Sequence, residues 1–178
     1  MPLIKLYIAA SLDGFIARPD GSLDWLEGLP NPNKVDHGYG AFLQTIDTVV
    51  MGRSTYEAIL GFGIEWPYKE FDSYVITSNP EYRVTTERTE VLEKINPSTI
   101  DHLRSNSQQN IWVIGGGKVI TTFLNHDGID EMILSVIPVV LGDGIRLFPD
   151  SPKESMFSLV DTTSFETGVV NLSYRRIQ

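Results

Sequence analysis

The segment from Ile111 to Leu124, with the sequence IWVIGGGKVITTFL, constrains the fold of this chain more than any other segment. An apolar, β-branched run leads directly into three glycines, and a lysine and a second apolar run follow. This order is typical of a buried strand, a tight turn and a helix. The N-terminus of such a helix carries unpaired N–H groups and a partial positive charge, and glycine lets a ligand approach the backbone. The segment therefore predicts a phosphate-binding turn, with a tight turn that binds no ligand as the alternative.

The composition is that of an ordinary globular protein and excludes several partners. The chain has 178 residues, 42% of them hydrophobic and 21% charged, which predicts a single domain over residues 1–178. A net charge of −9 argues against nucleic acid and anionic membranes as partners. The absence of cysteine excludes disulfides, thiolate nucleophiles and cysteine-ligated zinc, so we expect no metal site. With neither a signal-peptide pattern nor an apolar run of membrane-spanning length, we expect a soluble cytoplasmic protein.

Strand and helix patterns alternate along most of the chain, and only strand patterns follow them. Expected strands lie at 3–10, 48–51, 73–77, 89–92 and 111–115, with helices at 35–46, 54–60, 98–105 and 119–124. Three further strands are expected at 131–141, 156–163 and 168–176, and residues 18–33 form a loop rich in proline and glycine. This order predicts an α/β fold with a mostly parallel sheet and antiparallel strands added at one edge.

Two more strand ends carry polar residues suited to a phosphate. These residues are Gly52, Arg53, Ser54 and Thr55 after one strand, and Thr77 and Ser78 after the next. Arg53 would hold a phosphate with its planar guanidinium, although a solvated arginine and a helix N-cap at Ser54 or Thr55 also fit. Ligands of open α/β sheets bind outside the carboxyl ends of the strands. Three such ends predict one extended, phosphate-rich ligand such as a dinucleotide.

The three glycines match neither of two common phosphate-binding motifs. The dinucleotide fingerprint requires a glycine where Ile120 stands, and a P-loop requires serine or threonine after Lys118, where Val119 stands. The dinucleotide prediction therefore rests on the combination of strand ends.

Several segments, in their order along the chain, resemble the dihydrofolate reductase fold. They are residues 6–10 (LYIAA), 50–57 (VMGRSTYE), 75–78 (VITS) and 114–117 (IGGG). Residues 11–17 (SLDGFIA) and 137–144 (IPVVLGDG) are similar to the reductase domain of the bifunctional riboflavin-biosynthesis deaminase–reductase and its stand-alone relatives. The resemblance implies a three-layer fold with a mixed, mostly parallel central sheet, flanking helices and antiparallel C-terminal strands. It also implies a homodimer that acts on a small molecule.

The activity implied by the resemblance is an NADPH-dependent reduction of a pyrimidine or pteridine-like heterocycle. The most similar reaction is that of 5-amino-6-(5-phosphoribosylamino)uracil reductase in riboflavin biosynthesis. Ala10 and Ile16 would lie beside the nicotinamide, Gly52 to Thr55 at the pyrophosphate and ribose, and Thr77 and Ser78 near the adenosine 2′-phosphate. The residues that would approach the pyrophosphate from the other side are Gly115, Gly116, Gly117, Lys118, Val119 and Ile120. In this family the peptide bond between the paired glycines, here Gly115 and Gly116, is cis.

Hydride delivery to a C=N bond requires a proton for the nitrogen, and an acid near the acceptor supplies it. Counting back from Gly52 along the family's pattern places that acid at Asp36, and the matching hydroxyl on a later strand falls at Ser135. Asp36 equally fits a helix N-cap. Asp13 and Asp24 are further candidates, although both are also typical of turns.

Two departures from the family argue against folate as the substrate. Gly40 stands where an aromatic residue would stack on the pterin, and Phe71 stands near the position of the arginine that binds the glutamate tail. We expect Asp24, Trp25 and Tyr39 to shape the substrate pocket instead. The chain also lacks the ligands of the deaminase zinc site, so it would be a lone reductase. Dihydrofolate reductase itself and a non-catalytic, dimeric nucleotide-binding protein are the alternatives.

Overall fold

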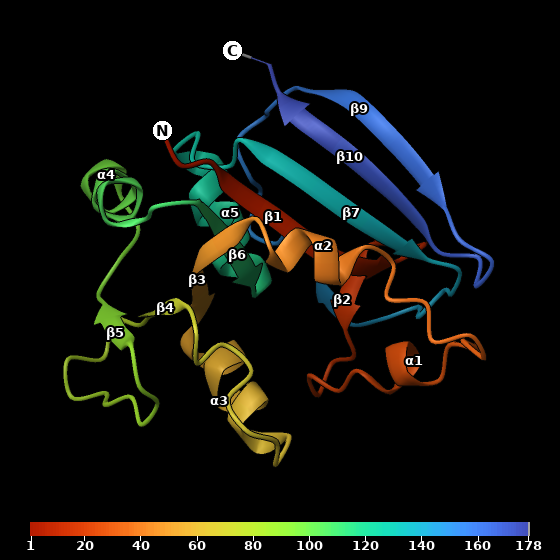
Figure 1. The fold of residues 1–178 in the computed structure, drawn as a ribbon, viewed down its shortest axis with the longest axis horizontal. Coiled ribbons are helices and arrows are strands. Elements are labelled where there is room, and N and C mark those ends of the chain that lie inside the picture. The colour runs from red at the N-terminus through yellow and green to blue at the C-terminus, as the bar shows by residue number, and fades with distance from the viewer. Residues whose placement is uncertain (178) are drawn as a thin grey trace.

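The computed structural model describes residues 1–177 and is built around an eight-stranded sheet (Figure 1). The strand order is β5-β4-β3-β6-β1-β7-β10-β9, parallel from β5 to β7 and antiparallel from β7 through β10 to β9. The strands are β1 (Ile4–Ser11), β3 (Ile46–Gly52), β4 (Asp72–Ile76), β5 (Thr89–Leu92), β6 (Asn110–Gly115), β7 (Glu131–Ile137), β9 (Phe157–Ser164) and β10 (Val170–Arg176). The prediction of a mostly parallel sheet with antiparallel C-terminal strands is confirmed.

Helices cover both faces of the sheet and complete three layers. Helices α4 (Pro97–Asn106) and α5 (Gly117–Asn125) pack on one face, where Phe123 is fully buried. Helices α2 (Tyr39–Leu43) and α3 (Arg53–Gly61) pack on the other face around Tyr56. Because a parallel sheet is buried on both faces, its strands are apolar throughout rather than alternating, as residues 49–51 of β3 illustrate.

The register of the parallel strands brings the predicted strand ends together. Met51 near the end of β3 lies opposite Val75 of β4 on one side and Gly115 of β6 on the other. The residues that follow these three strands therefore emerge at one edge of the sheet, as the sequence predicted. This edge positions the site.

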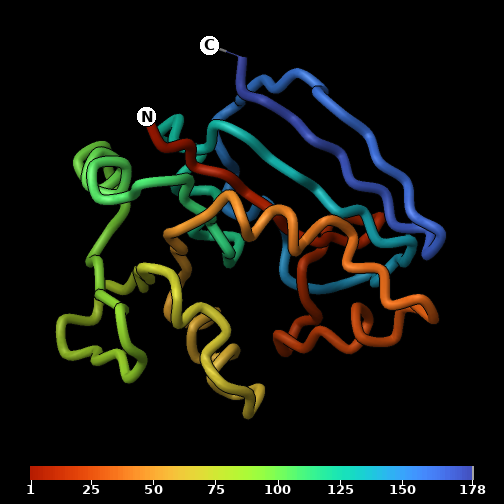
Figure 2. The backbone as a smooth tube through the Cα atoms, viewed as in Figure 1, coloured from red at the N-terminus to blue at the C-terminus, as the bar shows by residue number. Residues whose placement is uncertain are grey.

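The structure departs from the predicted elements in three places. The expected helix at 35–46 is reduced to the short α2, because Gly38 has a left-handed φ of 86° and β3 already begins at Ile46. The strand expected at 131–141 ends at Ile137, because Pro138 has no N–H for the ladder. The loop at 18–33 contains the one-turn helix α1 (Asp24–Glu27), and Figure 2 traces it along one end of the sheet.

A small second sheet lies beside this loop. It pairs β2 (Phe15–Ala17) with β8 (Ile145–Arg146) in antiparallel fashion, and neither strand was predicted. Its two strands are too short for a two-residue period to appear in the sequence. Over residues 1–177, none of the helices is both long and apolar enough to cross a membrane.

Candidate functional site

A cleft of about 1440 Å³ opens at the carboxyl ends of the parallel strands. It is lined by residues from the three predicted strand ends, from the loop before α2 and from β7. The structure thus brings most of the predicted site residues together. Those that line the cleft are Ile16, Asp36, Tyr39, Gly52, Arg53, Ser54, Thr55, Thr77, Ser78, Gly115, Gly116, Gly117, Lys118, Val119 and Ser135.

Four of the predicted site residues do not line the cleft. The side chains of Ala10 and Ile120 are 3% and 0% exposed and belong to the core beneath α5. Trp25 was expected to line the substrate pocket, but it is buried in a small hydrophobic cluster and does not line the cleft. The exposed carboxylate of Asp24 forms an ion pair with Arg18 at 2.6 Å. Residues in a long loop have no periodicity that fixes which side they face, which explains the two errors at α1.

The N-termini of α3 and α5 meet at the floor of the cleft. Their N-cap residues, Gly52 and Gly116, form no side-chain capping hydrogen bond within residues 1–177, so the N-cap expected at Ser54 or Thr55 is wrong. A Cβ atom on Gly52 would lie 3.1 Å from Cγ2 of Val119 on α5. Two helix ends with free N–H groups are therefore side by side, an arrangement that favours a bound anion.

Two of the three glycines are also required by the conformation and packing of the protein itself. A Cβ on Gly117 would lie 2.5 Å from the carbonyl oxygen of Arg146 and 2.8 Å from Cδ of Pro149. Gly115 has a φ of 137°, in the region that favours glycine, and the peptide bond between Gly115 and Gly116 is cis, as the resemblance implied.

The cations of the cleft gather around these helix ends. Arg53 donates from Nε to Glu57 Oε1 at 2.8 Å, and its guanidinium lies 4.7 Å from the centre of the Tyr82 ring. This position lets the other guanidinium nitrogens face a ligand. Lys118 is exposed on the first turn of α5. Glu93, which follows β5, also lines the cleft and was not predicted.

The other end of the cleft has an aromatic wall. The ring centres of Tyr7 and Tyr39 are 6.0 Å apart with the rings nearly parallel. The ring of Trp112 packs edge-to-face with the rings of Tyr39 and Tyr68, whose centres are 5.8 and 5.7 Å from its own. Flat aromatic surfaces of this kind pack well against a planar heterocycle.

A buried hydrogen-bond network lies beside this wall. The carbonyl oxygen of His37 accepts hydrogen bonds from Tyr7 Oη at 3.0 Å and from Asn171 Nδ2 at 2.7 Å. Ser135 Oγ donates to Asn171 Oδ1 at 2.6 Å, and these two side chains are 5% and 8% exposed. Sequence reasoning found Ser135 but missed Tyr7 and Asn171. The signal for Asn171 was an amide between two apolar residues, Val170 and Leu172, and the register places it directly opposite Ser135.

Asp36 lines the cleft and is fixed by the turn that leads into α2, although the N-cap of that helix is Gly38. Its carboxylate accepts hydrogen bonds from the N–H groups of Gly38 and Gly40, both at 3.0 Å, in the turn that leads into α2. These two bonds hold the pKa of Asp36 below its usual range, so the group is ionised at neutral pH. A side chain at Gly40 would place its Cβ 3.0 Å from the same carboxylate, which accounts for the missing aromatic residue there.

Asp13 is a turn residue. The Ser11 hydroxyl and the N–H groups of Leu141 and Gly142 donate to its carboxylate at 2.7, 3.1 and 2.7 Å. These bonds lower the pKa of Asp13 to about 2. The carboxylate joins the β1–β2 turn to the loop after β7, and it is not suited to donate a proton at neutral pH.

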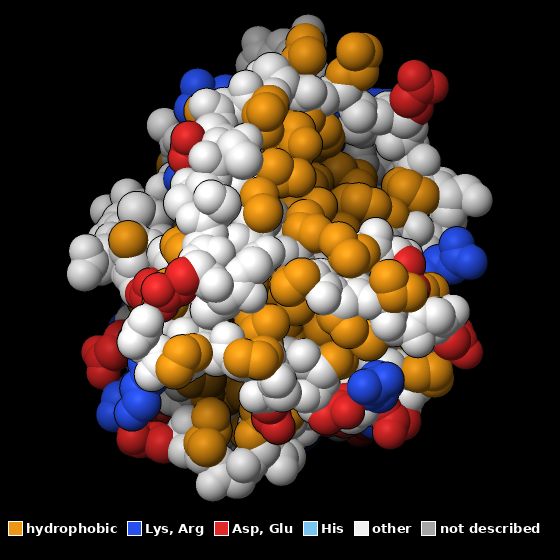
Figure 3. Space-filling view, turned by 90° about the vertical axis from the view of Figure 1, so that its right-hand side faces the viewer, with side chains coloured by type: hydrophobic (Ala, Val, Ile, Leu, Met, Phe, Trp, Pro, Cys, Tyr) orange, Lys and Arg blue, Asp and Glu red, His pale blue; other side chains and the backbone are white. Residues whose placement is uncertain are grey.

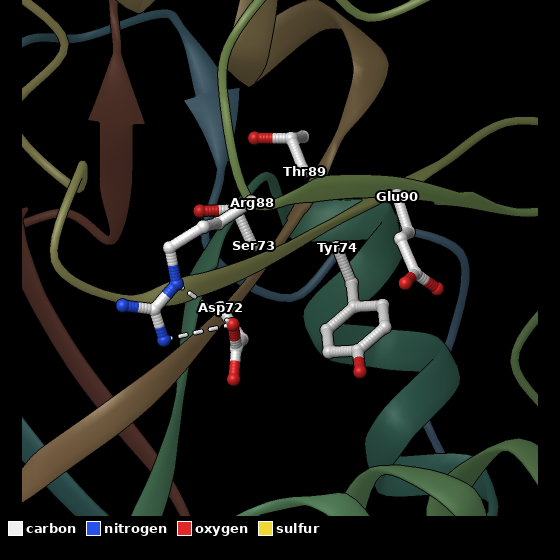
Figure 4. A pocket seen from close by; sticks show the side chains of 6 residues that line it. All are labelled: Asp72, Ser73, Tyr74, Arg88, Thr89 and Glu90. Carbon is white, nitrogen blue, oxygen red and sulfur yellow. Dashed lines mark hydrogen bonds and ion pairs between the residues drawn. The ribbon is translucent and has the colours of Figure 1, made fainter.

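A second, smaller hollow of about 220 Å³ lies between β4 and β5 (Figure 4). It is lined by Asp72, Ser73, Tyr74, Arg88, Thr89 and Glu90. Arg88 donates from Nε and Nη2 to Asp72 Oδ1, at 3.0 and 2.9 Å, which closes one side of the hollow. The predicted site residues line the large cleft instead, so the large cleft is the candidate site.

A family model matches this chain. The model of the RibD C-terminal domain matches residues 66–171, which is more than half of the chain. The chain belongs to the RibD C-terminal domain family. Two Bacillus subtilis (strain 168) proteins are similar over nearly their full length. The uncharacterized protein YwjB is 42% identical over 164 residues, 92% of each chain, and the uncharacterized protein YyaP is 34% identical over 181 residues, 96% of this chain and 93% of its own.

Solved structures agree with this family and fold. A Shewanella sp. PV-4 protein, named as a candidate riboflavin biosynthesis protein, superposes with a TM-score of 0.88 at 32% identity and covers 99% of both chains. The Thermotoga maritima deaminase/5-amino-6-(5-phosphoribosylamino)uracil reductase gives 0.72 at 18% identity, with 99% of this chain on 57% of its own. Dihydrofolate reductase of Enterococcus faecalis, complexed with NADP(H), gives 0.62 at 19% identity, with 99% of this RibD-type chain on 97% of its own. The dihydrofolate reductase-like fold is confirmed.

Proposed function

We propose that this RibD-type domain is an NADPH-dependent reductase of a planar pyrimidine or pteridine-like heterocycle. One observation carries the proposal: the free N-termini of α3 and α5 meet in a cleft whose other end is aromatic. A single small-molecule pocket typically has about 300–1000 Å³, so a cleft of about 1440 Å³ has room for a dinucleotide and an acceptor together.

The cofactor supplies the hydride, and the chain binds and orients it. The N–H groups at the two helix ends would hold the pyrophosphate, with Lys118 neutralising its charge. Arg53 would approach both the pyrophosphate and the adenosine 2′-phosphate. Thr77 and Ser78 would hold the adenosine 2′-phosphate, and Ile16 would pack against the nicotinamide. Thr77 is fixed there because its N–H donates to the carbonyl oxygen of Leu92 at 3.0 Å.

We assign the two predicted catalytic residues to orientation of the acceptor. An ionised Asp36 accepts hydrogen bonds, so it would bind the ring N–H or amino group of a pyrimidine. Ser135 retains its lone pairs after donating to Asn171 and would accept a second N–H. Tyr39 would pack on the flat face of the heterocycle.

The most similar reaction in the family, reduction of 5-amino-6-(5-phosphoribosylamino)uracil, requires a place for the ribose phosphate. Among the described residues that line the cleft, the arginines and lysines are Arg53, Lys118 and Arg146. The backbone of Arg146 lies against Gly117. All three residues therefore have their backbone at the end of the cleft proposed for the dinucleotide. Lys69 is paired with Glu65 at 3.0 Å and lies outside the lining. Binding of the acceptor's ribose phosphate would therefore depend on the side chain of Arg146.

The test is NADPH oxidation by the full chain with three acceptors. These are 5-amino-6-(5-phosphoribosylamino)uracil, its dephosphorylated form and dihydrofolate. The proposal predicts turnover of a ribosylaminopyrimidine; turnover of dihydrofolate alone would instead identify a dihydrofolate reductase. Binding of NADPH with no turnover of any acceptor would favour the non-catalytic alternative and contradict the proposal.

We also propose that the domain forms a homodimer through β9. This strand is one of the two edges of the sheet, its residues 158–164 are exposed, and Leu159 and Val160 are each 56% exposed. Figure 3 views the molecule from the right-hand side of Figure 1 and shows hydrophobic side chains gathered in a band on that face. A free edge and an apolar patch together suit a second copy of the same strand related by a twofold axis.

A further inference from the structure

The Tyr7 hydroxyl occupies a position that the proposed reaction leaves unassigned. Tyr7 lies on β1 two residues before Ala9, on the same face of the sheet, and both residues line the cleft. Its ring stacks on Phe42 with ring centres 4.8 Å apart, which fixes the direction of the phenol. The hydroxyl therefore lies in the aromatic wall at the acceptor end of the cleft.

The two residues predicted to supply a proton have none to give. The carboxylate of Asp36 is ionised and accepts hydrogen bonds from two backbone N–H groups. The hydroxyl proton of Ser135 is committed to Asn171 Oδ1 at 2.6 Å inside the buried network. A different group must complete the reduction of a C=N bond.

The proton of Tyr7 can be redirected at little cost. Its hydroxyl donates to the carbonyl oxygen of His37 at 3.0 Å, and that oxygen also accepts from Asn171 Nδ2 at the shorter distance of 2.7 Å. If Tyr7 turns to a ligand, the carbonyl keeps a hydrogen-bond donor and no buried polar group is left unpaired. Burial raises the pKa of Tyr7, so the phenol carries its proton across the neutral range.

We propose that Tyr7 is the catalytic proton donor to the acceptor nitrogen; this inference rests on the proposed reductase function. The carbon of the acceptor C=N bond takes the hydride, and the π electron pair moves to the nitrogen. The nitrogen takes the proton from Tyr7 Oη, and water in the cleft returns a proton to the phenolate. The acceptor thus gains one hydride and one proton, and the cofactor loses the hydride.

The test uses Tyr7→Phe in single-turnover reduction of whichever acceptor the wild type reduces, between pH 6 and pH 8. Phenylalanine keeps the ring that stacks on Phe42, and thermal unfolding checks that the variant folds. Tyr74→Phe is the matched control, because it removes a tyrosine hydroxyl from the same sheet at a buried residue outside the cleft lining and leaves the Tyr7 phenol in place. The titratable groups that face Tyr7 are Asp36, His37 and Tyr39, all from the segment at α2. The side chains that β6, β7 and β10 direct towards Tyr7 are not titratable.

If Tyr7 donates the proton, Tyr7→Phe lowers the hydride-transfer rate at pH 7 by about a hundredfold. Its rate then rises about tenfold for each unit of falling pH, since the proton must come from solution, while the wild-type rate stays nearly flat. NADPH affinity stays unchanged, and Tyr74→Phe loses less than about fivefold. A Tyr7→Phe loss equal to that of Tyr74→Phe, or a loss that is the same at every pH, would overturn this inference and leave the proposed reductase function standing. A wild type that reduces no acceptor overturns it together with the proposed function.

Discussion

Gly52 and Val119 lie so close that a Cβ atom on the glycine would be 3.1 Å from Cγ2 of the valine. This contact holds the first turns of α3 and α5 side by side at the end of β3. Because each helix end carries unpaired N–H groups, the two together form a stronger anion site than either alone. This contact supports the proposed dinucleotide site more strongly than any single motif does.

Substitution of Gly117 tests whether the turn at the start of α5 depends on close packing. In Gly117→Ala the new methyl group would clash with Arg146 and Pro149, so we expect a loss of about 1–3 kcal/mol in unfolding free energy. We also expect weaker NADPH binding, because the segment against α5 must shift. Gly61→Ala is the control, since its Cβ would enter open space at the end of α3. Equal urea midpoints for the two variants would contradict this account.

Arg53 is expected to distinguish NADPH from NADH. Arg53→Ala removes a guanidinium that can reach a phosphate, so NADPH affinity should fall about tenfold, or about 1.4 kcal/mol, and NADH affinity by less. Fluorescence titration with both cofactors measures this difference. Glu57→Gln is the control, because it releases Arg53 from its ion pair and should leave NADPH affinity equal or higher. An equal loss for both cofactors in Arg53→Ala would mean that Arg53 does not read the 2′-phosphate.

Asp36→Asn separates the chemical role of Asp36 from its role in the turn. Asparagine keeps one side-chain acceptor for the N–H groups that lead into α2, so the fold should persist. Loss of the negative charge should lower the hydride-transfer rate about tenfold by weakening orientation of the acceptor. NADPH affinity should change less than twofold. An equal loss in rate and in cofactor affinity would mean that the role of Asp36 is structural.

Asp13 is expected to make stability depend on acid pH. Its pKa is lowered to about 2 in the folded chain, against about 3.9 when unfolded, so its stabilisation is complete above about pH 4 and is lost as the pH falls towards 2. The wild type should therefore be more stable than Asp13→Asn at pH 7, and this advantage should vanish near pH 2. Urea unfolding at pH 7, 4, 3 and 2 measures it. A constant difference at every pH would show that the charge of Asp13 is not involved.

Dimer formation through β9 is tested with a charge on its exposed face. Val160→Lys places a cation in the proposed interface and should produce monomers, as measured by light scattering with size-exclusion chromatography. Leu60→Lys is the control, because Leu60 is exposed on α3, away from β9, and its substitution should leave the assembly unchanged. A wild type that is monomeric at micromolar concentration would contradict the dimer.

The parts of the fold with a strong local pattern were predictable from the sequence. The strand–glycine–helix segments at 111–124 and 48–60 lie where the sequence placed them, and β5 (Thr89–Leu92) has the predicted bounds. Tyr7 was missed because a parallel strand is apolar on both faces, so its sequence does not show which side chains face the cleft. Trp25 was misplaced because the loop around α1 is fixed by tertiary packing, which no local pattern encodes.

The most direct test of the central claim is a fluorescence titration of the full chain with NADPH, repeated with NADH and with Gly117→Ala. The account predicts saturable binding of NADPH to the wild type, weaker binding of NADH, and a loss of NADPH affinity in Gly117→Ala. Absence of saturable binding for both cofactors would contradict a dinucleotide site between α3 and α5.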